Sequence, residues 1–282
     1  MLKIKPSSVS LSITLLAAMA LSAQANNAIV STIQNAKSGT TVSVSGTYSG
    51  ITTRIQVPSG VTVKGPATFV FTTGASADGF YVPAGNSGVT LTSLTVEGAN
   101  HGIMIYGSSC SIQSCISMGN QNSGIEIIGS SAKNNTVNNC QSKQNADNAS
   151  SGGNADGFAC KQGASSGNKF SNDDAHQNSD DGYDFEKSVS PVTVTGCQSY
   201  SNGNYAGLTG NGDGFKMGIS GDNVAHTYTS CIAHNNTAGD TGDGFDQNDN
   251  AGKIHLTTCH SYSNKQKDRL TNVTLTNCTM QQ

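Results

Sequence analysis

Four aspartates and one lysine in the middle of the chain have the charges and spacing for chemistry on an acidic substrate: Asp156, Asp180, Asp181, Asp184 and Lys216. Carboxylates held close together repel one another unless a cation lies between them. Calcium accepts about six to eight oxygen ligands in an irregular site, whereas zinc favours His and Cys. We therefore expect the four aspartates to bind calcium. The alternative is that their Asp-Gly pairs are ordinary turns.

Lys216 is the candidate base of this set. A divalent cation nearby disfavours the ammonium form and would lower the pKa of Lys216 toward the range of a general base. An isolated lysine would instead form a weak surface salt bridge. Lys161 and Lys187 lie just beyond and are either contacts for a substrate carboxylate or solvated surface residues. The histidines show no mutual spacing typical of a triad or metal cluster: His101, His176, His226, His234, His255 and His260.

A sequence repeat must position these residues. It consists of an apolar residue, two residues, Cys, four residues and Asn, and its full copies are Ile112/Cys115/Asn120, Val137/Cys140/Asn145, Val194/Cys197/Asn202, Tyr228/Cys231/Asn236 and Leu256/Cys259/Asn264. A further copy, Phe170/Asp173/Asn178, has Asp in place of Cys, and Leu275/Cys278 begins another. The spacing predicts equivalent residues that stack from coil to coil.

A second column follows each asparagine and pairs Gly with a large apolar residue. Its members, 22 to 33 residues apart, are Gly79-Phe80, Gly102-Ile103, Gly124-Ile125, Gly157-Phe158, Gly182-Tyr183, Gly214-Phe215 and Gly244-Phe245. Short β-branched segments such as Val192-Thr193-Val194 indicate strands, and the repeat has no helical period. We predict an all-β fold, a right-handed parallel β-helix of about ten coils stacked about 4.8 Å apart.

In such a solenoid each column forms a ladder. The asparagine amides are expected to bond from rung to rung, and the ladder cysteines to act as small buried apolar residues and not as metal ligands. Cys110 and Cys160 lie outside the ladder, and their pairing stays open. Residues 26–37 predict a short N-terminal capping helix, with Ile29 and Ile33 on one face.

Insertions in the repeat indicate the functional face. Two long loops, Ala146–Ala155 and Gly203–Gly212, are expected to be the walls of a groove around the coil that carries Asp180 and Asp181. The residue before the column glycine is Asp156, Asp181, Asp213 and Asp243 in successive coils, and the residue two after it is Ala159, Asp184, Lys216 and Asp246. Strand alternation turns Asp184 and Lys216 outward, whereas Asp181 requires a bend at Gly182.

The next coil repeats the acidic character. Asp240, Asp243, Asp246 and Asp249 are expected to form either a second metal site or a charged wall. How many calcium ions the protein binds stays open at this point.

The chain has 282 residues and a formal net charge of −3. Residues 1–25 predict a signal peptide cleaved near Ala25, because Lys3 and Lys5 precede a short apolar run. That run is about half the 20 residues that a membrane anchor needs. We therefore expect a secreted, monomeric protein with one domain over residues 26–282. The sequence contains no run of basic residues that would indicate nucleic-acid binding. An acidic protein needs a cation to bind a polyanion.

At the segments Asn154–Lys161, Ser179–Asp184 and Asn211–Gly218 the sequence resembles polysaccharide lyase family 9, the pectate and exopolygalacturonate lyases of the parallel β-helix type. The resemblance implies that Asp156, Asp180, Asp181 and Asp184 bind calcium and that Lys216 is the Brønsted base. It implies cleavage of α-1,4-galacturonan by calcium-assisted β-elimination, with polygalacturonate or pectin as substrate.

Two other functions fit a β-helix. A polygalacturonase-type hydrolase would use Asp180 and Asp181 as acid and base, but the Gly-His-Gly and Arg-x-Lys strings of such enzymes do not occur here. A non-catalytic carbohydrate-binding solenoid stiffened by calcium would show regular Gly-Gly-x-Gly-x-Asp nonapeptides, which are also missing. Both remain alternatives to the lyase.

Overall fold

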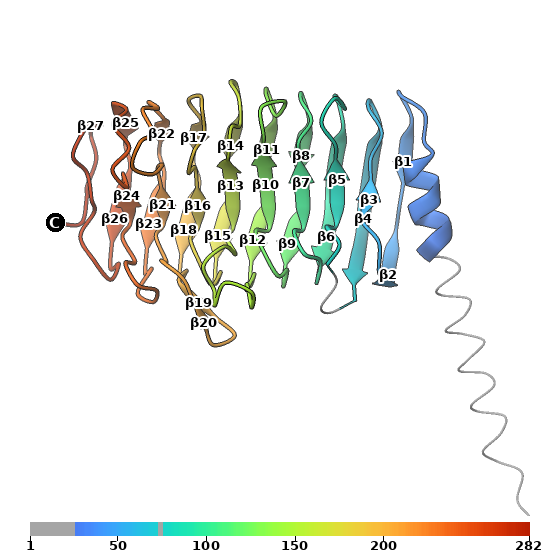
Figure 1. Ribbon diagram of the computed structural model, residues 1–282, viewed down its shortest axis with the longest axis horizontal. Helices are drawn as coiled ribbons and strands as arrows, with labels where there is room; N and C mark the ends of the chain where they lie inside the picture. The colour runs from blue at the N-terminus through green and yellow to red at the C-terminus, as the bar shows by residue number, and fades with distance from the viewer. Residues whose placement is uncertain (1–25, 73–75) are drawn as a thin grey trace, which may run out of the picture.

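The computed structural model describes residues 26–72 and 76–282. The predicted signal peptide, residues 1–25, lies outside the described residues. Coils of short strands stack into an elongated solenoid, with a helix at one end and the last strand, β27 (Val273–Thr276), at the other (Figure 1). The prediction of an all-β parallel β-helix is confirmed.

Two faces of the solenoid form one 17-stranded sheet. The first column of this sheet contains ten strands in register, which confirms the expected number of coils: β1 (Thr41–Ser43), β4 (Thr62–Phe71), β6 (Thr90–Glu97), β8 (Ser111–Gln113), β11 (Thr136–Asn138), β14 (Lys169–Ser171), β17 (Thr193–Thr195), β22 (Thr227–Thr229), β25 (Ile254–Thr257) and β27. The second column shares β4 and β6 and adds β2 (Gly46–Ile51), β9 (Ile116–Met118), β12 (Gln141–Lys143), β15 (Asp174–His176), β18 (Gln198–Tyr200), β23 (Ile232–His234) and β26 (His260–Tyr262).

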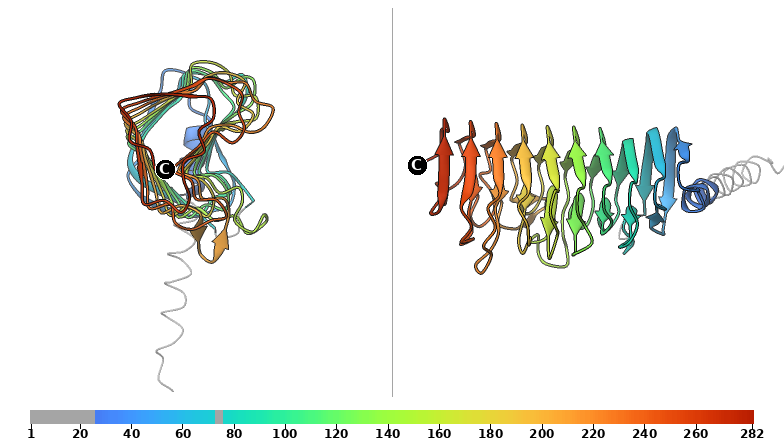
Figure 2. Two further views of the ribbon diagram at one scale, coloured as in Figure 1. Left: turned by 90° about the vertical axis from the view of Figure 1, so that its left-hand side faces the viewer. Right: turned by 90° about the horizontal axis from the view of Figure 1, so that it is seen from above.

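The third face is an eight-stranded parallel sheet, which we call the site sheet. Its strands are β3 (Ile55–Gln56), β5 (Phe80–Val82), β7 (Ile103–Ile105), β10 (Ile125–Ile128), β13 (Phe158–Lys161), β16 (Tyr183–Asp184), β21 (Phe215–Lys216) and β24 (Phe245–Asp246). Among the described strands, only the hairpin of β19 (Asn204–Tyr205) and β20 (Leu208–Thr209) pairs antiparallel. Viewed along the solenoid axis, the coils superimpose and this hairpin projects from one corner (Figure 2).

The cysteine column stands at the corner between the two columns of the large sheet. The residue before each ladder position takes a left-handed conformation, for example Ser114 (φ 50°) and Asn139 (φ 55°), which turns the chain sharply. The Cys140 thiol lies 3.4 Å from the backbone nitrogen of Cys115, and Asp173 accepts the equivalent bond from Cys140 at 2.8 Å. All eight cysteines are free, so Cys110 and Cys160 form no disulfide in this structure.

The asparagine ladder forms as predicted. The side-chain amide of Asn120 donates to Oδ1 of Asn145 at 2.8 Å, and Asn145 donates to Asn178 at 2.8 Å. The chain of bonds continues through Asn202 and Asn236 toward the C-terminal coils. Each rung thus satisfies buried polar groups on the next, which ties the coils into one register.

The core is a stack of aromatic rings behind the site sheet. Phe158, Tyr183, Phe215 and Phe245 lie face to face, with successive ring centroids 5.0, 4.7 and 4.8 Å apart. Because these rings point inward, their neighbours along each strand point outward. The N-terminal end is covered by a helix over residues 26–34, which buries Ile33 as predicted.

Candidate active site

Three neighbouring strands of the site sheet place the predicted residues on one face. Asp184 of β16 pairs in register with Ala159 of β13 on one side and with Lys216 of β21 on the other. Asp156 and Asp181 lie just before their strands. The columns read from the sequence are therefore columns of the structure.

The glycine after each acidic residue allows close approach between coils. A Cβ atom on Gly182 would lie 2.0 Å from Oγ of Ser199 and 2.6 Å from the carbonyl oxygen of Gly214. The φ of Gly182 is not in the left-handed region. The expectation that glycine supplies conformational freedom for a bend is therefore wrong at this position. Glycine is required because no side chain fits between the coils.

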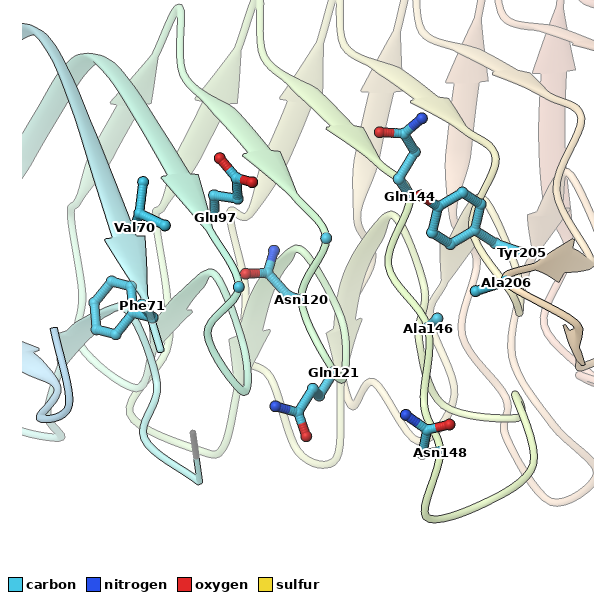
Figure 3. Close-up of a pocket in the computed structure, with 12 residues that line it drawn as sticks. Val70, Phe71, Glu97, Asn120, Gln121, Gln144, Ala146, Asn148, Tyr205 and Ala206 are labelled. Atoms are coloured by element: carbon cyan, nitrogen blue, oxygen red, sulfur yellow. The ribbon is translucent and has the colours of Figure 1, made fainter. Parts of the chain in front are cut away.

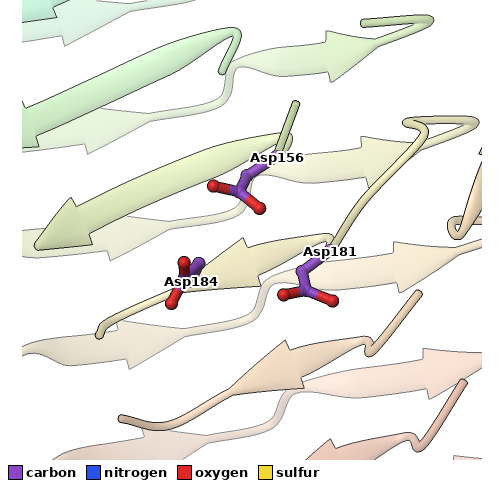
Figure 4. Close-up of side chains that lie close together, drawn as sticks. All are labelled: Asp156, Asp181 and Asp184. Atoms are coloured by element: carbon purple, nitrogen blue, oxygen red, sulfur yellow. The ribbon is translucent and has the colours of Figure 1, made fainter. Parts of the chain in front are cut away.

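Asp156, Asp181 and Asp184 point toward one another (Figure 4). One oxygen of each carboxylate lies within 4.8 Å of the others, and all three side chains are buried. Asp180 lies close enough that, besides burial, the charges of Asp181 and Asp156 raise its pKa, and its Oδ1 accepts the N–H of Asn211 at 2.7 Å. The structure thus brings together three of the four predicted ligands directly, with the fourth at the edge of the cluster.

Two buried lysines neutralise part of this charge. Nζ of Lys161 lies 2.8 Å from Oδ2 of Asp156 and 3.3 Å from Oδ2 of Asp184. Nζ of Lys216 lies 3.3 Å from Oδ2 of Asp181 and 3.9 Å from Oδ2 of Asp184. Four carboxylates and two ammonium groups leave a formal charge of −2, which one divalent cation would balance.

The closeness of these buried charged groups changes the pKa values of the aspartates and of Lys216. Burial raises the pKa of Asp156 and of Asp181 to about 7, against the opposing charges of Lys161 and Lys216. Burial alone would lower the pKa of Lys216, but the charges of Asp181 and Asp184 outweigh it and raise that pKa above the usual lysine range. Without a cation to neutralise the carboxylates, Lys216 therefore holds its proton and cannot act as a base.

The donor set fits a hard cation. Oδ1 of Asp156 and Oδ2 of Asp181 are buried without a hydrogen bond, and such oxygens are costly unless an ion or another partner satisfies them. Carboxylate oxygen is the ligand that calcium prefers, and no cysteine or histidine belongs to this cluster. Asp156, Asp180, Asp181 and Asp184 are thus the residues that could hold the ion.

The two lysines predicted as substrate contacts differ from each other. Lys161 is buried and paired with the acidic cluster, so a solvated surface position is wrong for it. Lys187 is exposed and pairs with its neighbour Glu186. Only Lys161 therefore belongs to the site as the structure shows it.

A largely buried charge cluster that the sequence did not indicate spans the three coils before the coil of Asp156. His101 Nδ1 lies 2.8 Å from Asp78 Oδ1, and its Nε2 lies 3.2 Å from Glu126 Oε2. Burial opposes protonation, but these two partners raise the pKa of His101 to about 9. The column register could have revealed the cluster, because Asp78 and His101 each precede a column glycine. The spacing of the histidines relative to one another did not indicate these carboxylate partners of His101.

The two long loops meet beside the site. The N–H of Thr209 donates to the carbonyl of Ser151 at 3.2 Å, and Gly210 donates to the carbonyl of Ser179 at 2.7 Å. The loops therefore form one joined wall over Ser179 and Asp180, and not the two separate walls that were expected. Asp180 supports this wall through its bond to Asn211.

A cleft lies beside the two long loops. It is lined by residues of both long loops, such as Asn148 and Tyr205, and by Glu97, Asn120 and Gln144 from the coils (Figure 3). None of the four aspartates, nor Lys216, lines it. The cleft is thus separate from the acidic cluster.

Comparison with known proteins decides the family. A model described as the Pel9A-like, right-handed β-helix region matches residues 17–277. The chain belongs to this family. Membership of polysaccharide lyase family 9, inferred from the sequence, is confirmed.

The proteins and solved structures that this chain resembles include several named as polysaccharide lyases. The chain is 34% identical over 193 residues to pectate lyase L of Dickeya chrysanthemi, and the match covers 66% of this chain and 43% of the relative. The crystal structure of pectate lyase Pel9A superimposes with a TM-score of 0.75 at 28% identity, over 88% of this chain and 72% of the other. A rhamnogalacturonan lyase shares the fold with a TM-score of 0.67 at 23% identity, over 80% and 66%. The chain spans less than half the length of the curated relative.

No helix among the described residues is both long and apolar enough to cross a membrane.

Proposed function

We propose that the protein is a secreted pectate lyase that cleaves α-1,4-galacturonan by calcium-assisted β-elimination. Asp156, Asp180, Asp181 and Asp184 hold the calcium ion, and Lys216 is the base. The observation that carries the proposal is the buried amine of Lys216 beside three converging carboxylates, two of whose oxygens are buried without a hydrogen bond. The family and the names of its members support the same reaction.

When bound, calcium would also take the carboxylate of a galacturonate residue and stabilise the negative charge that develops as the C5 proton leaves. It would offset the aspartate charges that keep Lys216 protonated. The raised pKa of Lys216 and the buried oxygens of Asp156 and Asp181 that have no hydrogen bond both support a requirement for calcium.

Lys216 acts in its neutral form. Its nitrogen lone pair takes the C5 proton, and the C5–H electrons form the C4–C5 double bond. The C4–O glycosidic bond breaks with its electrons on the leaving oxygen, which takes a proton from water. The products are a 4,5-unsaturated uronide and a new reducing end. The register of β21 against β16 fixes Lys216 beside Asp184, so the base stands next to the ion that holds the substrate carboxylate.

Lys161 is positioned to bind acidic substrate. Its ammonium is buried against Asp156 and Asp184, and a calcium ion at these carboxylates would compete with it. We propose that Lys161 then turns toward a uronate carboxylate. Lys187 lies on the exposed surface near the same edge, where its charge attracts the polyanion without a fixed contact.

A product assay distinguishes the lyase from its alternatives. The protein is incubated with polygalacturonate and calcium, and the ultraviolet absorbance of unsaturated uronide is measured together with new reducing ends. If the unsaturated uronide and the new reducing ends increase in equal amounts, the result supports elimination. Reducing ends without absorbance would show a hydrolase, and binding without cleavage would leave a carbohydrate-binding solenoid.

A further inference from the structure

A second acidic triad lies on the same face, C-terminal to Lys216. Asp213, Asp243 and Asp246 each offer an oxygen within 4.8 Å of the others, and all three residues are buried. Asp213 and Asp243 precede their strands, and Asp246 ends β24. None of the three was assigned to the site described above.

The second triad repeats the geometry of the first, two coils further along. In both triads two aspartates precede column glycines in successive coils, and the third stands two residues after the second glycine. Asp213 thus corresponds to Asp156, Asp243 to Asp181 and Asp246 to Asp184. Two rungs place the triads about 10 Å apart along the solenoid.

Local bonds repeat as well. Oδ1 of Asp184 accepts the N–H of Glu186 at 2.9 Å, and Oδ1 of Asp246 accepts the N–H of Asn248 at 2.7 Å. This bond occupies Oδ1 of each aspartate. In both coils the other oxygen, Oδ2, pairs with a cation of the neighbouring coil. The two carboxylates are therefore oriented in the same way.

Buried carboxylate oxygens of this triad that have no hydrogen bond indicate a cation site. Both carboxylate oxygens of Asp243 are buried without a hydrogen bond, as is Oδ2 of Asp213. Asp243 and Asp213 are each 0% exposed. Burying a carboxylate with no donor to either oxygen costs several kcal/mol, unless a cation satisfies it. This observation is independent of the first site.

The cation of the next coil differs between the two sites. Arg269 pairs with Asp246 across the coils, as Lys216 pairs with Asp184. Its Nη1 lies 3.2 Å from Oδ2 of Asp246, yet its side chain is 44% exposed and can swing away. Three carboxylates and one guanidinium leave a formal charge of −2, equal to that of the first site.

We propose that Asp213, Asp243 and Asp246 bind a second hard divalent cation of the calcium class. Arginine does not lose its proton in proteins, so Arg269 cannot act as a base. Lys216 lies between the two sites, because it pairs in register with Asp246 as well as with Asp184. The ion of the second site would join two coils, the one that carries Lys216 and the next one. The comparison of equivalent positions in the two triads rests on the proposed function of the first site. The buried oxygens of Asp213 and Asp243 are independent of it.

Counting bound calcium tests the proposal. Metal-free protein is titrated with calcium chloride by isothermal calorimetry, and bound calcium is counted by equilibrium dialysis. We expect two ions per chain for the wild type and one for Asp243→Asn. The matched control Asp249→Asn, an exposed carboxylate of the same coil, should retain two.

Asp181→Asn separates this proposal from the proposed function, because it should lose the other ion. A wild type that binds one ion, lost in Asp181→Asn and kept in Asp243→Asn, overturns the second site and leaves the lyase proposal standing. One ion lost only in Asp243→Asn would do the reverse. If Asp243→Asn does not fold by circular dichroism, Asp213→Asn and the wild-type count decide.

Discussion

The buried cluster around His101 makes the stability of the protein dependent on pH. Its pKa is about 9 in the folded protein against 6.5 for an unperturbed histidine. Because the folded protein holds the proton more tightly, this stabilisation is complete below pH 6.5 and is lost as the pH rises to 9. This difference in pKa corresponds to about 3 kcal/mol of stability.

The variant His101→Gln removes this term. We expect it to be less stable than the wild type by about 3 kcal/mol at pH 6 and by much less at pH 9.5, since the wild-type imidazole is then largely neutral. Urea unfolding at the two pH values measures the difference. His255→Gln is the control, because His255 is exposed. An equal loss of stability at both pH values would refute the proposed charge on His101.

Three further variants test the site and the ladder. Asp181→Asn should weaken calcium binding at the first site at least tenfold in a calcium titration, with activity lost as a consequence; unchanged binding would contradict its role as ligand. Lys161→Met should tighten calcium binding about tenfold, because it removes a competing cation, whereas exposed Lys187→Met should not; weaker binding in Lys161→Met would contradict the competition. Burial raises the pKa of Asp173 from 3.8 to about 7, so the stability that it contributes falls as the pH rises from about 4 to about 7. Asp173→Cys should therefore gain about 3 kcal/mol or more at pH 8 and less at pH 5 in urea unfolding. An equal effect of Asp173→Cys at both pH values would refute that explanation.

The repeat was sufficient to predict the fold and the site columns. The asparagine ladder from Asn120 to Asn264 and the column of Gly followed by a large apolar residue recur from coil to coil. They therefore align the coils even where the loop between the two columns is longer. That register correctly placed Asp184 beside Lys216, because parallel strands pair residue by residue.

Contacts that depend on side-chain length and loop course were not predictable. Lys161 reaches back to Asp156 in its own coil, which no column rule describes. The lack of space for a side chain at Gly182 and the hydrogen bond between Thr209 and Ser151 both depend on distances between coils. The sequence pattern does not give these distances. His101 was overlooked because histidines were compared with one another and not with the acidic residues of the same columns.

The second acidic triad also follows from the column register, because its three aspartates occupy column positions. The coil after Lys216 was expected to contain either a metal site or a charged wall. The structure brings Asp213, Asp243 and Asp246 together and leaves Asp249 exposed at the surface. The difference arises because only residues at column positions point toward the same place.

The most direct test of the account is ultraviolet absorbance during polygalacturonate cleavage, with wild type and Lys216→Ala compared in calcium and in excess chelator. We expect absorbance to rise only for the wild type in calcium, to stop on chelation and to resume when calcium is restored. Lys216→Ala should lose about a thousandfold in rate or more while its calcium titration is unchanged. Undiminished elimination by Lys216→Ala, or by the wild type in chelator, would contradict the account.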